Sequence, residues 1–125
     1  MRSIELADLF VFHAKIVEQT GGSPGVRDLG LIESALQRPF ITFDEKDMYP
    51  TVIQKISVMT YALIKNHGFV DGNKRVGVAM MLLLLRLNEI MISYSQAELI
   101  ELGLKTAEGV WTEKDIERWI KEHQT

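Results

Sequence analysis

The sequence predicts an all-α domain, a compact bundle of about six helices. Apolar residues recur at the spacing of an amphipathic helix along most of the chain. The stretch Val76–Leu85 is apolar on nearly every side, which is typical of a helix at the centre of a bundle. Only Phe40–Phe43 and Ile90–Tyr94 suggest short extended pieces. The chain has 125 residues, 46% of them hydrophobic, so we expect one domain over residues 1–125 with a core of its own.

The first part of the chain contains two predicted helices. The first helix begins after Ser3 and runs to about Gln19. Its buried face consists of Leu6, Leu9, Phe10, His13, Ile16 and Val17, with the histidine expected as a hydrogen-bonded core residue. The glycine- and proline-containing segment 21–25 ends this helix. A second, short helix is expected over Leu29–Gln37, and Pro39 ends it.

The next two helices should form the middle of the bundle. Pro50 suits the first turn of a third helix, because its missing N–H would have no partner there. This helix stops near Asn66. Its apolar positions are Val52, Ile56, Met59 and Leu63. A loop over residues 67–72 then leads into a fourth helix, Asn73–Leu87.

The last two helices are indicated by their capping residues. Ser95 and Glu98 form the sequence signature of a capping box. Gly109 separates this helix from the last one, which Thr112 caps. The buried stripe of the last helix contains Ile116, Trp119 and Ile120. We expect Trp119 and the other tryptophan, Trp111, to be core residues.

The loop between the two central helices contains the residues best suited to phosphate chemistry. It continues into the next helix as His67-Gly-Phe-Val-Asp-Gly-Asn-Lys-Arg75. The first N–H groups of a helix that opens at Asn73 have no partner within the helix, so they can bind an anion. Gly72 allows a phosphate close to the backbone. Lys74 and Arg75 add positive charge at the same place.

The same segment also supplies a candidate base and a candidate metal ligand. His67 can accept a proton from an incoming hydroxyl near neutral pH. Asp71 can hold a Mg²⁺ ion that is already bound to phosphate oxygens. Phe69 and Val70 alternate with these groups and are expected to anchor the loop in the core. The spacing alone supports a phosphate site and an ordinary Asp-Gly-Asn turn about equally.

This segment resembles the Fic/Doc family motif, His-x-Phe-x-Asp/Glu-Gly/Ala-Asn-Gly/Lys-Arg, at every defined position. The upstream stretch from Gly25 to Pro39 is similar to the N-terminal part of death-on-curing toxins. The resemblance implies a helical bundle with the active-site loop between two central helices. The roles it implies are a general base for His67, a Mg²⁺ ligand for Asp71, phosphate contacts for Gly72, Asn73, Lys74 and Arg75, and a buried anchor for Phe69.

Two positions favour one reaction within this family. Lys74 stands where nucleotidyl-transferring relatives have Gly, and Val78 stands where they have a second Arg. Death-on-curing toxins share the Lys. The resemblance therefore implies the toxin of a toxin–antitoxin module, a kinase that uses Mg²⁺ and ATP. It would transfer the γ-phosphoryl group to a threonine of elongation factor Tu and block translation. The alternatives are a Fic-type transferase that moves AMP or UMP to a hydroxyl, and a catalytically silent Fic-like binding module.

Composition and charge narrow the expected partners. The net charge of −3 suggests neither a direct DNA contact nor an anionic membrane partner. The absence of cysteine agrees with a cytoplasmic location. No Glu follows a Ser or Thr by four residues, the spacing of the inhibitory helix in some Fic proteins. We therefore expect inhibition by a separate antitoxin protein.

For five further polar residues the main interpretation is a role outside the chemistry of the site. Arg27, Asp28 and Arg38 are expected to cap helices and pack loops, with a place in the substrate cleft as the alternative. Lys65 is expected to be solvated, with a phosphate contact as the alternative. His123 lies in what is expected to be a frayed C-terminus and is given no role.

Overall fold

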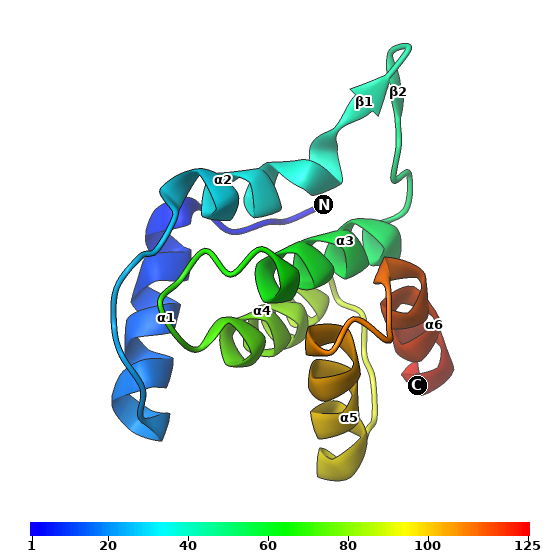
Figure 1. Ribbon diagram of the computed structural model, residues 1–125. Coiled ribbons are helices and arrows are strands. Elements are labelled where there is room, and N and C mark those ends of the chain that lie inside the picture. Colours follow the sequence, from blue (N-terminus) through cyan, green and yellow to red (C-terminus); the bar gives the residue numbers. More distant parts are fainter.

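The computed structural model describes residues 1–125 and confirms the all-α bundle (Figure 1). The six helices are α1 (Leu6–Thr20), α2 (Leu29–Gln37), α3 (Val52–Lys65), α4 (Asn73–Leu87), α5 (Gln96–Ala107) and α6 (Glu113–His123). A short 3₁₀ helix, η1 (Arg38–Phe40), and two short strands, β1 (Thr42–Phe43) and β2 (Lys46–Asp47), separate α2 from α3. No helix combines the length and apolar character that crossing a bilayer requires.

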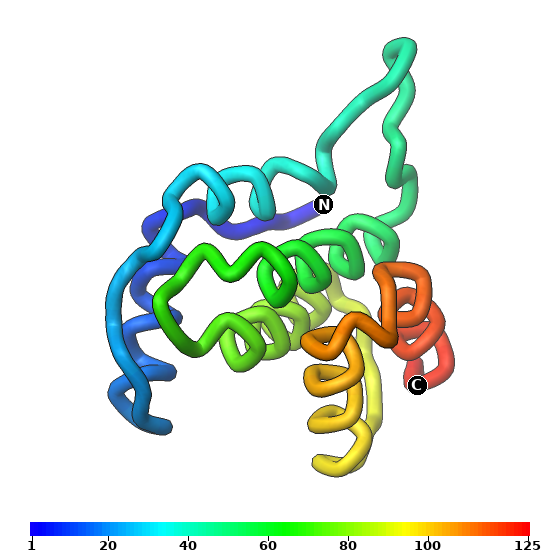
Figure 2. Tube along the Cα trace, viewed as in Figure 1, coloured from blue at the N-terminus to red at the C-terminus, as the bar shows by residue number.

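Helices α3 and α4 share the centre of the bundle. Figure 2 shows them side by side, with α1 on one side and α6 on the other. The apolar sequence of α4 suggested that this helix is the centre of the bundle. Helix α3 buries nine residues and α4 buries seven, so the two helices share that position. The polar residues Ser57 and Thr60 of α3 can be buried because their hydroxyls donate to the carbonyls of Ile53 and Ile56, at 2.7 and 2.8 Å.

The helix starts follow the capping chemistry of the sequence, with two corrections. The predicted capping box is present at α5, where Ser95 and Glu98 exchange hydrogen bonds of 2.8 and 3.1 Å. Helix α1 is capped by Glu5 and begins later than Ser3 suggested. Helix α3 is capped by Thr51, so Pro50 lies just outside the cap and not in the first turn. A Thr side chain can accept the hydrogen bond that a helix start needs, whereas Pro cannot.

The segment before α3 forms a small hairpin, and its first strand lies within the extended piece expected at Phe40–Phe43. Strands β1 and β2 are antiparallel, and the turn residues Asp44 and Glu45 both have positive φ values, 53° and 63°. The hairpin projects from the bundle (Figure 1). Its base is held by the buried ammonium group of Lys55, which donates to the carbonyls of Pro39 and Tyr49.

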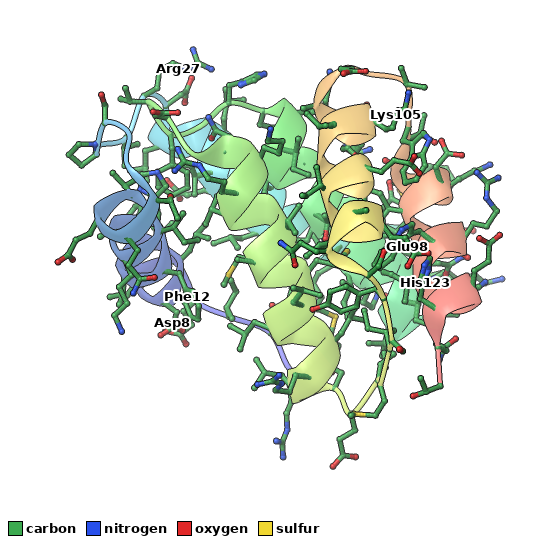
Figure 3. The ribbon with its side chains drawn as sticks, turned by 90° about the horizontal axis from the view of Figure 1, so that it is seen from below. Asp8, Phe12, Arg27, Glu98, Lys105 and His123 are labelled. Atoms are coloured by element: carbon green, nitrogen blue, oxygen red, sulfur yellow. The ribbon has the colours of Figure 1, made fainter.

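The C-terminal helix is fastened to α5, contrary to the expectation of a frayed end. The imidazole of His123 stacks on Trp119 at 4.1 Å between ring centroids. Its Nδ1 donates to the Trp119 carbonyl at 2.7 Å, and its Nε2 donates to the Glu98 carboxylate at 2.8 Å. Figure 3 shows Glu98 and His123 pointing toward each other. Both tryptophans belong to the core, as predicted: Trp119 is buried and Trp111 packs against the cluster.

Candidate active site

The loop between α3 and α4, residues 66–72, pairs with the connection between α1 and α2. Val26 and Phe69 form an antiparallel bridge. The N–H of Val70 donates to the carbonyl of Gly25 at 3.1 Å. These two segments, about 40 residues apart in sequence, therefore run side by side (Figure 2). The pairing gives the loop a defined backbone before any ligand is bound.

His67 is exposed and lies at the start of this loop in a strained backbone conformation. Its φ is 52°, in the left-handed region that a residue with a Cβ rarely adopts. The ring makes no hydrogen bond, so both ring nitrogens are open to a substrate. Strained backbone of this kind is often kept at functional sites, where the surrounding contacts hold it in place.

Arg27 supplies the contacts that hold this conformation. Its Nε donates to the carbonyl of His67 at 2.6 Å, and its Nη2 donates to the carbonyl of Asn66 at 3.2 Å. Its backbone N–H donates to the carbonyl of Gly68 at 2.8 Å. Arg27 therefore binds three successive carbonyls around the candidate base. The expectation that it packs a loop is confirmed, and the loop is the one that contains His67. Asp28 caps α2 by accepting from the Leu31 N–H at 3.2 Å.

The side chain of Asn73 is used inside the loop. It is buried, and its amide accepts from the N–H of Phe69 and donates to the carbonyl of Phe69, both at 3.0 Å. The side chain thus closes the loop on itself. The group of Asn73 that remains for an anion is its backbone N–H. Phe69 is 2% exposed and anchors the loop as predicted, but Val70 is 53% exposed because its side chain points away from the core.

Asp71 is held as a carboxylate in front of the helix start. Its Oδ1 accepts from the N–H of Gly72 at 2.8 Å, and its Oδ2 accepts from the N–H of Ser23 at 3.2 Å. These two hydrogen bonds lower the pKa of Asp71 more than burial raises it, and the Arg75 guanidinium at 3.5 Å lowers it further. No group of three acidic or histidine side chains surrounds it. A Mg²⁺ ion here would need phosphate oxygens and water as its other ligands.

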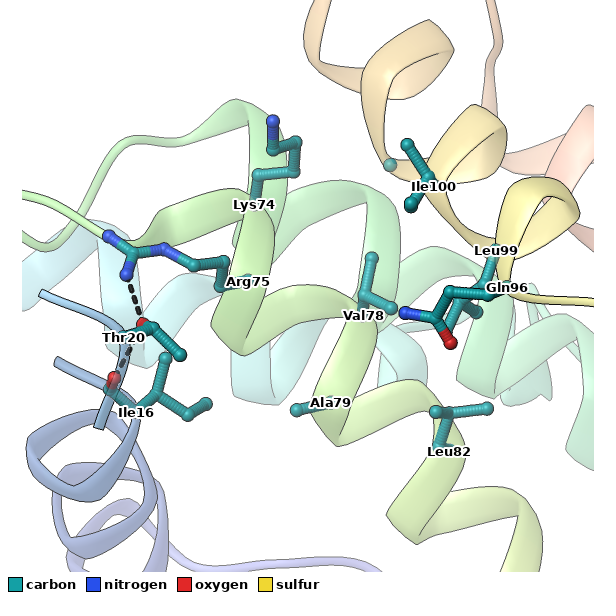
Figure 4. A pocket seen from close by; sticks show the side chains of 11 residues that line it. Ile16, Thr20, Lys74, Arg75, Val78, Ala79, Leu82, Gln96, Leu99 and Ile100 are labelled. Atoms are coloured by element: carbon teal, nitrogen blue, oxygen red, sulfur yellow. Dashed lines mark hydrogen bonds between the residues drawn. The ribbon is translucent and has the colours of Figure 1, made fainter.

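The two predicted cations point in different directions (Figure 4). Arg75 reaches the end of α1, where its Nη1 donates to the hydroxyl of Thr20 and to the carbonyl of Gly21 at 2.7 Å. The stem of Lys74 lies against Gly103 of α5. The structure therefore brings Arg75 and Asp71 together at the start of α4, and it places Lys74 on the side that faces α5.

The start of α4 has the free donors that an anion site requires. Gly72 is the N-cap in the left-handed conformation, with φ of 79°. The backbone N–H groups of Asn73, Lys74 and Arg75 make no hydrogen bond. The positive end of the helix dipole lies at the same point. These groups can bind a phosphate without any change in secondary structure.

A groove of about 370 Å³ begins beside the two cations and runs between α1, α4 and α5 (Figure 4). Its apolar walls are formed by Ile16, Val78, Ala79, Leu82, Leu99 and Ile100. Lys74 and Arg75 lie at one end. No sequence pattern was interpreted as this groove, although Ile100 of α5 is 52% exposed and α5 buries Leu102, Gly103 and Thr106 instead. An apolar residue on the solvent side of a helix was the available signal.

Lys65 and Arg38 lie outside the loop and its anion site. The Nζ of Lys65 is 3.4 Å from the carbonyl of Ala107, at the end of α5, so the side chain is used within the fold. Arg38 forms an ion pair of 3.0 Å with Glu113 at the start of α6. Both side chains therefore connect the ends of neighbouring helices.

A helical bundle with an exposed histidine, an ionised carboxylate and a free helix start in one loop defines a candidate phosphate-transfer site. The model of the Fic/DOC family matches residues 3–85, which include every residue of this site, and the chain belongs to that family. The resemblance seen in the sequence is thereby confirmed.

Two curated relatives are similar to the chain over different lengths. "Toxin Doc" of Mycolicibacterium smegmatis is 37% identical over 73 residues, which are 58% of this chain and 56% of that protein. "Protein kinase doc" of Escherichia phage P1 is 29% identical over 112 residues, 87% of this chain and 85% of that protein. The first match thus spans just over half of its relative, and the second spans most of both chains.

Proposed function

We propose that this chain is the toxin of a toxin–antitoxin module and that it transfers the γ-phosphoryl group of ATP to a protein hydroxyl. The observation that carries the proposal is the exposed imidazole of His67, in a loop whose backbone Arg27 holds and which leads into the anion site at the start of α4. The names of the two relatives, a toxin and a protein kinase, support it. The proposed location is the cytoplasm.

The reaction follows from the groups in the loop. His67 accepts the proton of the acceptor hydroxyl, whose oxygen forms a bond to the γ-phosphorus while the bond from that phosphorus to the β–γ bridging oxygen breaks, and ADP leaves. The free N–H groups at the start of α4 and the guanidinium of Arg75 stabilise the negative charge of the transferred group. Asp71 is placed to hold Mg²⁺, which would neutralise phosphate charge when bound.

The choice between phosphoryl and nucleotidyl transfer depends on Lys74 and Val78. Lys74 occupies the mouth of the groove next to α5, where the Gly of nucleotidyl-transferring relatives would leave space. Val78 gives the groove an apolar wall where those relatives have a second Arg. Both differences favour a nucleotide whose γ-phosphoryl group lies at the start of α4. The acceptor proposed is a threonine of elongation factor Tu. AMP or UMP transfer is the alternative reaction.

The proposed antitoxin contact is the groove between α1, α4 and α5. An amphipathic helix would bury apolar residues against Ile16, Leu82 and Ile100. A carboxylate on that helix could bind Arg75 at the end of the groove. Such a segment can be disordered until it binds, so that the antitoxin folds on the toxin.

Expression of the chain in a bacterial host tests the toxin proposal. Wild-type protein without an antitoxin should arrest growth. His67→Ala should remove the arrest, because loss of a general base typically lowers the rate by about 10²–10⁴-fold. The variant should fold normally, since the imidazole is exposed and makes no hydrogen bond. Growth arrest by His67→Ala at the wild-type protein level would show that His67 is not the base.

A further inference from the structure

His13 is a buried residue of α1 whose side chain contacts the candidate active-site loop on the side that faces the core. It is 3% exposed. Its Nε2 lies 2.7 Å from the carbonyl oxygen of Asp71, and its ring stacks on Phe69 with centroids 3.8 Å apart and planes 11° apart. The contact joins residues 58 positions apart in the chain. One side chain of α1 therefore touches both the anchor of the loop and the backbone of the candidate metal ligand.

We propose that His13 is a positioning residue that orients Asp71 for binding of a Mg²⁺–nucleotide complex. The proposal rests on the proposed function, since it concerns the same nucleotide site. His13 cannot contact a substrate directly, because it is buried beneath the loop. Its effect passes through the peptide group between Asp71 and Gly72.

The hydrogen bond requires a proton on Nε2, because a carbonyl oxygen can only accept. The donor therefore fixes the direction of the Asp71 carbonyl. The same planar peptide group carries the N–H of Gly72. That N–H donates to Oδ1 of Asp71 at 2.8 Å. Rotation of the peptide plane would thus move the hydrogen bond that orients the carboxylate.

The same peptide group also sets the start of α4. Gly72 is the N-cap of that helix, and its φ of 79° belongs to the left-handed region. The next three N–H groups are the free donors of the anion site. His13 is thereby linked to both halves of the candidate site, the carboxylate that would hold the metal and the donors that would hold a phosphate.

A purely structural role for His13 makes a different prediction from a positioning role. If only packing matters, the ring and its stacking on Phe69 carry the effect, and His13→Phe should resemble the parent. If the donor matters, His13→Gln should resemble the parent, because its amide N–H can reach a similar position. The two substitutions therefore separate the effect of the aromatic ring from the effect of the hydrogen-bond donor at the same position.

The experiment uses the full chain with His67→Ala, so that growth arrest does not interfere with expression. Calorimetry measures the affinity for ATP in Mg²⁺, and NMR measures the exchange rate of the Gly72 amide proton. We expect His13→Phe to weaken Mg²⁺–ATP binding about 10-fold, the upper range for one hydrogen bond, and to speed exchange of the Gly72 amide. His13→Gln should stay within about threefold of the parent in both measurements. Should His13→Phe not fold, His13→Met supplies a second apolar side chain without a donor.

Two outcomes would overturn the positioning role. One is an apolar variant that matches the parent in affinity and in Gly72 exchange. The other is a loss with His13→Gln as large as that with His13→Phe. Failure of the proposed function looks different: the parent itself would not bind Mg²⁺–ATP. The exchange rate of Gly72 would still decide the question for His13, because it needs no ligand.

Discussion

The Nε of Arg27 donates a hydrogen bond of 2.6 Å to the carbonyl oxygen of His67. This bond connects the segment after α1 to the candidate base, 40 residues later in the chain. The strained φ of His67 costs about 1–3 kcal/mol and requires contacts that offset it. Arg27 provides three of these contacts, to the carbonyls of residues 66–68.

Arg27→Ala should lower the rate of transfer about 10-fold, because the backbone of His67 would relax from its left-handed conformation. Steady-state measurement of transfer to a protein acceptor checks this. Arg118→Ala is the matched control, since Arg118 is exposed and its ion pairs lie within α6. Equal activity of wild type and Arg27→Ala would show that the left-handed conformation does not depend on the guanidinium.

Gly22→Ala should impair nucleotide binding more than Gly21→Ala does. A Cβ at Gly22 would lie 2.6 Å from Oδ2 of Asp71, whereas a Cβ at Gly21 would meet nothing within 4 Å. Both glycines have positive φ, so both variants carry backbone strain of about 1–3 kcal/mol. The difference between them reports the contacts of the added methyl group with Asp71 and with the Arg75 guanidinium, which would lie 3.0 Å away.

Titration of Mg²⁺–ATP into the two glycine variants checks this prediction. We expect an affinity at least about 10-fold lower for Gly22→Ala than for Gly21→Ala, because the displaced carboxylate is the candidate metal ligand. Similar affinities for both variants would mean that the loop after α1 can shift away from Asp71 without consequence for the site.

The pair of His123 and Glu98 should make the stability of the fold depend on pH. Burial lowers the pKa of His123, but its hydrogen bonds to Glu98 and to the Trp119 carbonyl outweigh burial and raise it. The hydrogen bond from His123 and those from Ser95 lower the pKa of Glu98 to about 2. Because the pKa of His123 is raised on folding, this residue stabilises the fold fully below pH 6.5, and the stabilisation is lost as the pH rises through the raised pKa. Because the pKa of Glu98 is lowered on folding, this residue stabilises the fold fully above pH 4.5, and the stabilisation is lost as the pH falls toward the lowered pKa.

The contribution of this pair is therefore complete between pH 4.5 and pH 6.5. Thermal melting of wild type and His123→Gln at about pH 5.5 and about pH 9 checks the expectation. The difference in melting temperature between the two proteins should shrink at the higher pH, where His123 is neutral in the wild type. A difference that stays constant over this range would show that the charge of His123 does not stabilise the contact between α5 and α6.

Much of the fold could be predicted because helix formation depends mainly on residues that are close together in the sequence. The periodic apolar residues and the Ser95 capping box depend on neighbours within one or two turns, and the bounds of α2 and α4 agree with the structure. Pro50 was misplaced because Thr51 is the better cap. His123 was misjudged because its partner Glu98 lies on another helix, and no local pattern reveals that contact.

The candidate site could be predicted only as residue types. The motif indicated a base, a carboxylate and an anion site, but it could not show how they are held. Arg27 binds the loop from 40 residues upstream, and His13 does so from 58 residues upstream. The Asn73 side chain turned out to be used by Phe69, which leaves only its backbone N–H for an anion. These arrangements arise from tertiary packing.

The most direct test of phosphoryl transfer by this chain compares two labels of ATP. Purified chain, Mg²⁺ and either γ-labelled or α-labelled ATP are incubated with elongation factor Tu or with a bacterial lysate, and His67→Ala serves as the control. If the chain is a kinase with His67 as the base, the γ-label appears on a protein, the α-label does not, and His67→Ala transfers neither. Transfer of the α-label would contradict phosphoryl transfer and would make the chain a nucleotidyltransferase. Transfer of neither label by the wild-type chain would contradict the use of ATP as donor.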